Sequence, residues 1–311
     1  MALRNHIKNF VTVFAICWIL APLDINGDTD TLKQKITADD PSNAAYIVED
    51  YQIRLQNGRF EVTGAPDSDT KLKFSIFSEP VFGDLDRDGD QDAVMFLVFM
   101  PGGSGTFYYV AAALKTEGGF YGTTAVLIGD RIIPLNVKIR NSKVVATYAD
   151  RSSDQPMATM PSVKKSSYLI LKEGDLSRPQ VMGEKDAVFK GWVTIAHEVR
   201  AFRPCSARSD LWLSGQSPVI DTIKAEYREN ILPMDHSYAP LFMTLIGQLI
   251  ETPNQGFGTD YPGAIHASQL IEVWAKGGCE KDPIVVDTPR PGTRIYSPLR
   301  VTGRARGTWF F

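Results

Sequence analysis

Five aspartates stand at alternate positions in the stretch GDLDRDGDQDAV, residues 83–94. Counted from Asp84 as position one of a calcium-binding loop, further carboxylates fall at positions three, five and nine. Gly89 falls at the sharp turn of position six, and the residue at position seven offers its backbone carbonyl. Hard cations take about six to eight oxygen ligands at short range. The spacing therefore predicts a calcium site built from Asp84, Asp86, Asp88, Asp90 and Asp92.

The loop departs from an EF-hand, because position twelve is Met95 where an EF-hand presents a bidentate glutamate, and because the flanking segments are typical of strands. The carboxylates are offset within the loop only by Arg87. They repel one another, and a divalent cation would relieve that repulsion. The alternative is an acidic turn without an ion, since Asp-Gly turns are ordinary in hairpins and salt screens exposed charges.

The residues around this loop predict a mostly antiparallel β domain over residues 40–174. Short apolar or alternating runs are separated there by Gly, Pro, Asn and Asp. The pair Asn57-Gly58 between two alternating runs predicts a hairpin turn. The glycine-rich stretch PGGSGTFYY, residues 101–109, lacks the second glycine of a nucleophile elbow and the lysine of a phosphate-binding loop, so it predicts a plain loop.

A second β-rich domain with one helix is predicted over residues 188–279. Strand-like runs are GWVTIAHEVRAF, LWLS, LFMTLIGQLIE and AIHASQLIEVWA. After Ser217-Pro218, the spacing predicts a helix whose apolar face carries Val219, Ile220, Ile223 and Tyr227.

The N-terminal residues have the layout of an export signal, with Arg4 and Lys8 followed by an apolar run at residues 10–23. That run is shorter than the ~20 residues of a spanning helix, so residues 1–27 are predicted to be a cleaved signal peptide or a short membrane anchor. We expect an exported protein that is periplasmic, on the cell surface or membrane-anchored.

Two cysteines remain after the leader, Cys205 and Cys279. An even number of cysteines in an exported chain predicts that they form a disulfide; two free, buried thiols are the alternative.

Charge and the lack of catalytic motifs argue against two classes of function, nucleic-acid binding and enzymatic catalysis. The net charge is −3, with Lys and Arg scattered along the chain, so a nucleic-acid partner is not expected. The segment HEVR at residues 197–200 lacks the second histidine of H-E-x-x-H, and no motif ties Ser, His and Asp into a triad. We therefore expect no enzymatic activity.

Three resemblances add to this interpretation. Residues 41–171, with FGDLDRDGDQDAV and GGSGTFYYVAAAL, resemble an uncharacterised exported bacterial β module. Their acidic loop is similar to the DxDxDGxxD calcium loops of FG-GAP and integrin-type β repeats. The resemblance implies calcium binding at this loop and no known activity.

Residues 191–278, with GWVTIAHEVRAFRPC and GFGTDYPGAIHASQL, resemble a small bacterial envelope domain attached to lipoproteins related to NlpE. NlpE serves copper homeostasis and envelope stress signalling, and the resemblance implies an OB-like barrel. The copper-binding Cys-x-x-Cys pattern is absent from this sequence.

Residues 285–311 are similar to the start of the immunoglobulin-like domain of bacterial spore germination proteins, matched at Ile295, Ser297, Pro298, Val301, Gly303 and Ala305. This resemblance implies a surface-binding or structural β-sandwich. We expect it to begin at residue 284 and to be cut off at residue 311, in a fragment of a longer protein.

The sequence thus predicts a mainly β protein: an antiparallel β domain, a small OB-like β-rich domain with one helix, and the start of an immunoglobulin-like β-sandwich. The predicted function is non-enzymatic binding or architecture in the bacterial envelope, with an envelope or cell-surface protein or a polysaccharide as partner and calcium in the acidic loop. The alternatives are a cell-envelope hydrolase that uses the loop carboxylates as acid and base, and an envelope-stress sensor.

Overall fold

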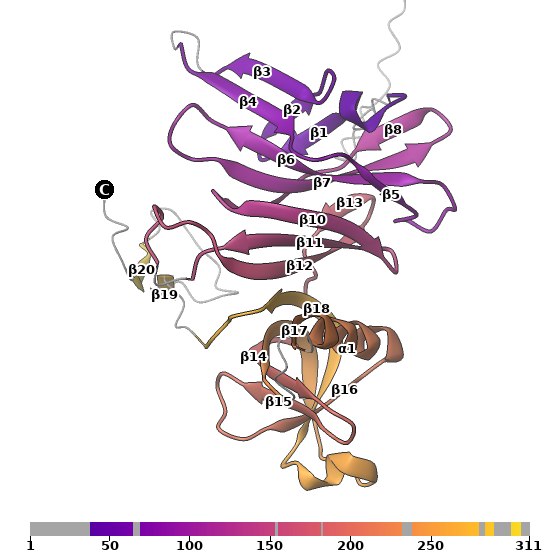
Figure 1. Ribbon diagram of the computed structural model, residues 1–311, viewed down its shortest axis with the longest axis vertical. Helices are drawn as coiled ribbons and strands as arrows, with labels where there is room; N and C mark the ends of the chain where they lie inside the picture. The colour runs from indigo at the N-terminus through magenta and orange to yellow at the C-terminus, as the bar shows by residue number, and fades with distance from the viewer. Residues whose placement is uncertain are drawn as a thin grey trace, which may run out of the picture. The chain divides into compact units, whose positions relative to one another are not determined.

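The computed structural model describes residues 38–64, 69–152, 155–181, 183–231, 238–279, 284–288 and 300–305 (Figure 1). The predicted leader, residues 1–27 with its apolar run at 10–23, lies outside the described residues. The fold is mainly β, with 53% strand and 10% helix, which confirms the predicted fold class. None of the helices in the described residues has both the length and the hydropathy that crossing a membrane requires.

The chain first forms a short 3-10 helix, η1 (Pro41–Asn43), and a two-stranded sheet of β1 (Ala45–Val48) and β2 (Tyr51–Arg54). A seven-stranded sheet follows, ordered β3-β4-β6-β7-β8, with β5 on β6 and β9 on β7. Its strands are β3 (Arg59–Thr63), β4 (Lys71–Ile76), β5 (Val81–Gly83), β6 (Asp92–Met100), β7 (Phe107–Thr116), β8 (Gly119–Gly122) and β9 (Val126–Asp130).

The apolar run of β6 is buried on both faces, which explains why it does not alternate with polar residues. Met95 and Phe99 contribute to a core shared with β1 and β2. Val94 and Phe96 face the opposite way, into a core shared with the next sheet. The first four strands of that sheet along the chain are β10 (Ile133–Arg140), β11 (Lys143–Asp150), β12 (Val163–Lys172) and β13 (Asp175–Ser177).

Five strands close into a barrel, paired in the order β14-β15-β16-β18-β17 and back to β14. All the pairings are antiparallel except β16 with β18. This is a closed, five-stranded barrel of the OB type. Its strands are β14 (Ala187–Ile195), β15 (Arg200–Pro204), β16 (Leu211–Gly215), β17 (Leu241–Ile250) and β18 (Ala264–Trp274).

The prediction of a single strand over GWVTIAHEVRAF is wrong, because β14 and β15 are two strands joined by a tight turn. The Ala196 backbone N–H donates to the Val199 carbonyl (2.8 Å) and reverses the chain there. No glycine, proline or asparagine marks this turn, so its sequence does not signal it.

Helix α1 (Ser217–Ile231) connects β16 to β17 and is the only α-helix of the described residues. The four apolar residues predicted to share its face are all buried, packed with Phe202, Leu213 and Ile265 of the barrel. This confirms the predicted helix.

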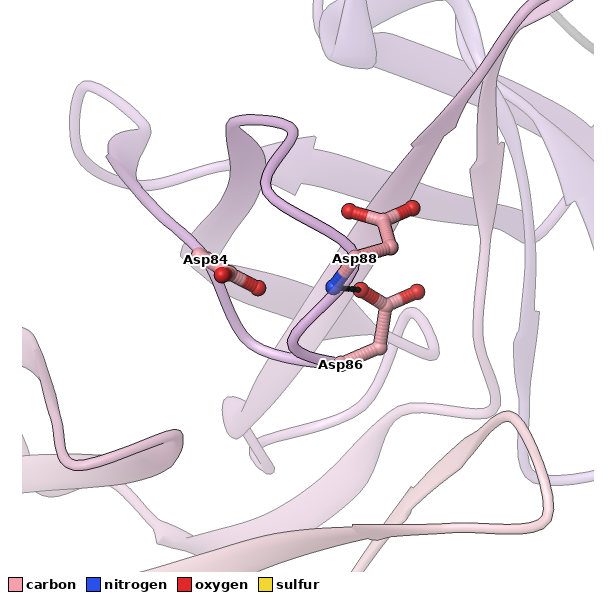
Figure 2. A group of neighbouring side chains, drawn as sticks. All are labelled: Asp84, Asp86 and Asp88. Carbon is pink, nitrogen blue, oxygen red and sulfur yellow. Dashed lines mark hydrogen bonds between the residues drawn. The ribbon is translucent and has the colours of Figure 1, made fainter.

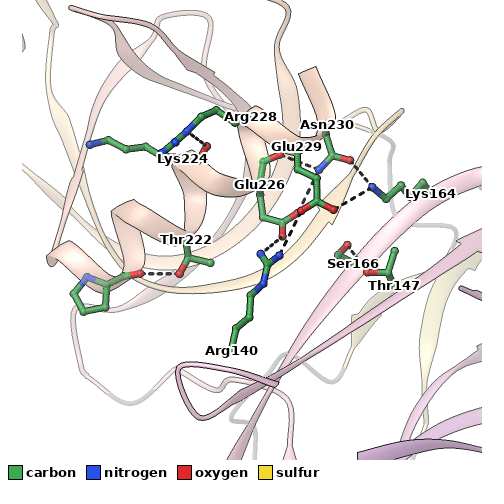
Figure 3. A network of polar contacts seen from close by, with 11 residues as sticks. Arg140, Thr147, Lys164, Ser166, Thr222, Lys224, Glu226, Arg228, Glu229 and Asn230 are labelled. Carbon is green, nitrogen blue, oxygen red and sulfur yellow. Dashed lines mark hydrogen bonds and ion pairs between the residues drawn. The ribbon is translucent and has the colours of Figure 1, made fainter. Parts of the chain in front are cut away.

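The second half of α1 also contacts β10 and β12 through polar side chains (Figure 3). Lys164 Nζ lies 3.3 Å from Asn230 Oδ1, and Arg140 lies 3.9 Å from Glu226 and 3.6 Å from Glu229. Glu226 and Asn230 are buried, and Asn230 Nδ2 also donates to Glu226 Oε2 (3.3 Å), so both buried groups have hydrogen-bond partners.

Sheet pairing also crosses the domain boundary expected between residues 174 and 188. Strand β18 is longer than its neighbour β16, and its far end pairs with β12 from Lys165↔Trp274 to Ser167↔Glu272. Each strand thereby covers an edge of the other that would otherwise be unpaired.

The Asn57-Gly58 turn is present, with φ of 50° and 77°, both in the left-handed region that a tight hairpin turn needs. The strands around it pair elsewhere: β2 with β1, and β3 with β4. Only one bridge, Gln56↔Arg59, spans the turn. The predicted turn is therefore present, but the prediction that its two flanking strands pair with each other is wrong.

At the end of the described residues, β19 (Ile284–Thr288) and β20 (Thr302–Ala305) form an antiparallel pair. Residues 289–299 and 306–311 of the predicted immunoglobulin-like segment lie outside the described residues.

Candidate metal site

The acidic loop, residues 84–92, joins the short strand β5 to the longer β6, and their antiparallel pairing ends at Gly83↔Asp92. Within it, carboxylate oxygens of Asp84, Asp86 and Asp88 lie within 4.8 Å of one another (Figure 2). The structure thus brings three of the five predicted ligands together. The Asp84 side chain is half-buried, and the other two are exposed.

Hydrogen bonds within the loop hold these carboxylates in place. Asp84 Oδ1 accepts the Arg87 N–H (2.6 Å), Asp86 Oδ1 accepts the Asp88 N–H (3.1 Å), and Asp88 Oδ1 accepts the Asp90 N–H (2.8 Å). Aspartate favours such local bonds to the backbone two or three residues further on. Each carboxylate keeps its second oxygen outside these bonds.

Two left-handed residues let the loop fold so tightly. Arg87 has φ of 70° and Gly89 has φ of 94°. A Cβ at Gly89 would meet no atom within 4 Å, so this position requires glycine for its backbone conformation and not for space.

Asp92 is not part of this group, and its role is different. It is fully buried, with Oδ2 accepting the N–H groups of Leu85 (2.8 Å) and Asp86 (3.3 Å) and Oδ1 accepting the N–H of Lys115 (2.9 Å). Its carboxylate thereby ties the loop to β7. Asp90 is also outside the group of three.

Burial raises the pKa of Asp92, although its backbone hydrogen bonds act in the opposite direction. The pKa of Asp86 is also raised, first by burial and further by the neighbouring carboxylates of Asp92 and Asp88. A bound cation would reverse this repulsion, because the ion's charge dominates a site of this kind.

Arg87 connects the acidic loop to the turn between β10 and β11. Its Nε donates to Ser142 Oγ (3.3 Å), and that hydroxyl donates to the Asp84 carbonyl (3.4 Å). A cavity of about 280 Å³ lies beside these residues and is also lined by Lys143. Arg87 therefore links the acidic loop to the β10–β11 turn without being part of the group of three carboxylates.

Cys205 and Cys279 are joined by a disulfide in the structure, with a Cα–Cα distance of 5.3 Å. The bond links the residue after β15 to the segment after β18. Two strand ends of the barrel are thereby connected covalently.

A second polar cavity was not predicted from the sequence. It lies at the barrel, between the β14–β15 turn, the loop before β16 and the β17–β18 loop, and it is lined by Glu198, Asp210, Phe257, Asp260 and Tyr261. Its residues are far apart in the chain. The only local signal is the loop GFGTDYPG, which carries aromatic and acidic residues between two strands.

No protein-family model matches the sequence, and no curated protein is similar to it at a significant level. Among solved structures, the Cpx pathway activator NlpE from Escherichia coli is matched with a TM-score of 0.23 and 12% identity, over 71% of this chain and 97% of that one. The match names the same protein as the sequence resemblance. A TM-score of this size does not establish a shared fold, so no property of this chain follows from it.

Proposed function

We propose that this chain is an exported, non-catalytic binding or structural protein of the bacterial envelope, and that its acidic loop holds a calcium ion. The observation that carries the proposal is the convergence of Asp84, Asp86 and Asp88, whose carboxylate oxygens lie within 4.8 Å of one another. The loop is anchored at its far end by the buried Asp92.

The oxygen chemistry of the loop suits calcium. Three carboxylates supply the charge, and backbone carbonyls and water complete the six to eight oxygens that calcium takes. The Asp90 carbonyl stands at the position where such loops use the backbone. The Arg87 guanidinium is hydrogen-bonded to Ser142. Among the described contacts it makes no hydrogen bond to the three carboxylates, so it would not compete with a cation for them.

Two features support an extracytoplasmic location. The Cys205–Cys279 disulfide is of a kind that persists in oxidising compartments and is rare in the cytosol. The predicted export signal at residues 1–27 agrees with it.

The carboxylates of the acidic loop are a poor basis for hydrolysis. General acid and base catalysis needs two groups with separated pKa values that both reach a substrate. The two loop carboxylates with raised pKa are Asp86 and Asp92, and Asp92 is fully buried with both oxygens accepting backbone N–H groups. This favours a structural ion site over a catalytic pair.

The calcium proposal is tested by thermal unfolding of the full chain in calcium chloride and in EGTA. A ligand that binds only the folded state adds about 2.7 kcal/mol at a concentration 100 times its Kd. We expect calcium to raise the wild-type midpoint by several degrees and to leave Asp86→Asn/Asp88→Asn unmoved.

The matched control is Asp50→Asn/Asp69→Asn, which removes the same charge from two exposed aspartates outside the loop. It should respond to calcium as the wild type does. If the wild type does not respond, or if both double variants respond equally, the loop is not a calcium site.

A further inference from the structure

The cavity at the barrel, hereafter the barrel cavity, is lined from three separate segments and measures about 560 Å³. Glu198 comes from the turn between β14 and β15, Asp210 directly precedes β16, and Phe257, Asp260 and Tyr261 come from the loop between β17 and β18. This last loop contains the 3-10 helix η3 (Gly256–Asp260), below β16 in Figure 1. The volume is within the range of small-molecule sites, about 300–1,000 Å³.

Trp212 contacts residues that line the cavity or lie beside it. Its side chain is 7% exposed, its ring centroid lies 5.4 Å from that of Tyr261, and Arg200 Cζ lies 4.5 Å from its centre. The backbone of η3 also packs against the indole at Gly258. A Cβ added there would come within 3.1 Å of the ring. One buried ring thus connects β15, β16 and the β17–β18 loop.

Hydrogen bonds hold the β17–β18 loop in a defined conformation. Thr252 Oγ1 donates to the Tyr261 carbonyl (3.1 Å), and Thr259 Oγ1 donates to the Gly256 carbonyl (2.9 Å). The backbone N–H of Trp212 donates to the Gly263 carbonyl (3.0 Å) at the end of the loop. A site held in this way loses little conformational entropy on binding.

The charge of the barrel cavity is negative. Arg203 forms a bidentate pair with Asp210, with distances of 2.6 and 3.1 Å, and neutralises that carboxylate. Among the described residues, Glu198 has its only ion-pair contact with His197 (3.9 Å), where both side chains are exposed, and Asp260 has none with Lys or Arg. The phosphates of an oligonucleotide would be repelled here.

The cavity also offers aromatic surface. The Phe257 side chain is 51% exposed although it is large and apolar. Tyr261 is half-buried beside it, and its phenol is a hydrogen-bond donor at neutral pH; burial, with Asp210 and Asp260, raises the phenol pKa further. Ligand sites commonly combine aromatic rings with a few fixed polar groups. Such a site suits a ligand that has both apolar faces and hydrogen-bonding groups.

We infer that the barrel cavity binds a neutral oligosaccharide. OB barrels take oligonucleotides or oligosaccharides at the face of their second and third strands and at the loops that flank it, and β15 and β16 are those strands here. The carboxylates of Glu198 and Asp260 disfavour the first ligand class and accept hydrogen bonds from the hydroxyl groups of the second. Phe257 and Tyr261 would contact the apolar faces of the sugar rings.

The test is isothermal titration calorimetry of the full chain with maltotriose and with tri-N-acetylchitotriose as probes, in EGTA. We expect at least one trisaccharide to bind, and Phe257→Ala and Glu198→Gln/Asp260→Asn each to weaken it by about tenfold or more, a loss of ~1.4 kcal/mol. The matched controls are Phe77→Ala, whose ring is 50% exposed elsewhere, and Asp50→Asn/Asp69→Asn; both should bind as the wild type does.

Two further probes complete the experiment. Spermidine tests whether the carboxylates serve an organic cation instead, and a thymidine hexanucleotide tests the other OB ligand class. The inference is overturned if neither trisaccharide binds, if only spermidine or the oligonucleotide binds, or if the cavity variants bind the sugar as well as the controls do. Because the titrations are made in EGTA and use none of the loop aspartates, failure of the calcium proposal would not affect them.

Discussion

The acidic loop and the barrel cavity are both rich in carboxylates, but they arrange them differently. In the loop, three aspartates from five consecutive residues bring their oxygens within 4.8 Å of one another. In the cavity, carboxylates from three separate segments line about 560 Å³ together with two aromatic rings. The first spacing matches a single hard cation, and the second matches a larger ligand with hydroxyl groups and apolar faces.

The two sites also differ in what holds their side chains in place: local contacts in the loop and distant ones in the cavity. Backbone N–H groups of the loop itself hold its carboxylates. The cavity depends on Trp212 of β16, which contacts Arg200 of β15 and the β17–β18 loop. The loop should therefore survive damage to the barrel, and the cavity should not.

Removing the disulfide should have the largest effect and should separate the two regions. The bond closes a loop with a sequence separation of 74. Loss of that constraint in Cys205→Ser/Cys279→Ser costs roughly 4.5 kcal/mol in the chain-entropy model. Urea unfolding followed by tryptophan fluorescence reports on the barrel, because Trp192, Trp212 and Trp274 all lie in its strands.

The calcium response of the same variant, measured at a temperature where it is folded, should be retained. Cys17→Ser serves as the control and should unfold at the wild-type urea concentration. An unchanged midpoint in the double variant would mean that the disulfide does not stabilise the barrel.

Asp92→Ala should have the second largest effect. It leaves the backbone N–H groups of Leu85, Asp86 and Lys115 without their acceptor in a fully buried position. We expect a loss of about 3 kcal/mol in the free energy of unfolding, measured by urea titration in EGTA. Asp90→Ala, an exposed change in the same loop, should stay within ~0.5 kcal/mol of the wild type. Equal losses in the two variants would contradict the separate role of Asp92.

A smaller effect should distinguish Asp88 from Asp90 in calcium affinity. Asp88 belongs to the group of three carboxylates, whereas Asp90 does not. Calcium titration calorimetry should show affinity reduced by about tenfold or more in Asp88→Asn and by less than about threefold in Asp90→Asn, because charge count at the ligands sets affinity. Similar losses in both would mean that the Asp90 side chain also binds the ion.

The smallest effect should be a dependence of stability on pH in the absence of calcium. The pKa of Asp86 is raised in the folded state, so the folded chain binds more protons than the unfolded chain between the ordinary aspartate pKa and the raised one. Its contribution to stability therefore falls as pH rises through that window and improves as pH falls through it.

Thermal midpoints in EGTA between neutral pH and the ordinary aspartate pKa measure this effect. The wild type should gain stability relative to Asp86→Asn as the pH falls. A relative loss would mean that the carboxylate is stabilised in its charged form in the folded loop.

Much of the fold could be predicted because it depends on contacts between neighbours in the chain. The apolar face of α1 and the runs of β6, β7, β11 and β12 are visible in the residues themselves. The Asn57-Gly58 turn was also predictable, but its flanking strands pair with β1 and β4. Partner choice depends on burial of whole faces, which a two-residue signal does not report.

The sequence by itself determined the acidic loop, because its three converging carboxylates come from five consecutive residues and accept hydrogen bonds from the backbone of the same loop. It also determined the two cysteines available for pairing and the mainly β composition. Tertiary structure alone decided that Asp92 faces inward to bind the loop backbone, and that β12 joins β18 across the expected boundary. It alone also assembled the barrel cavity around Trp212, since these features depend on residues brought together from distant parts of the chain.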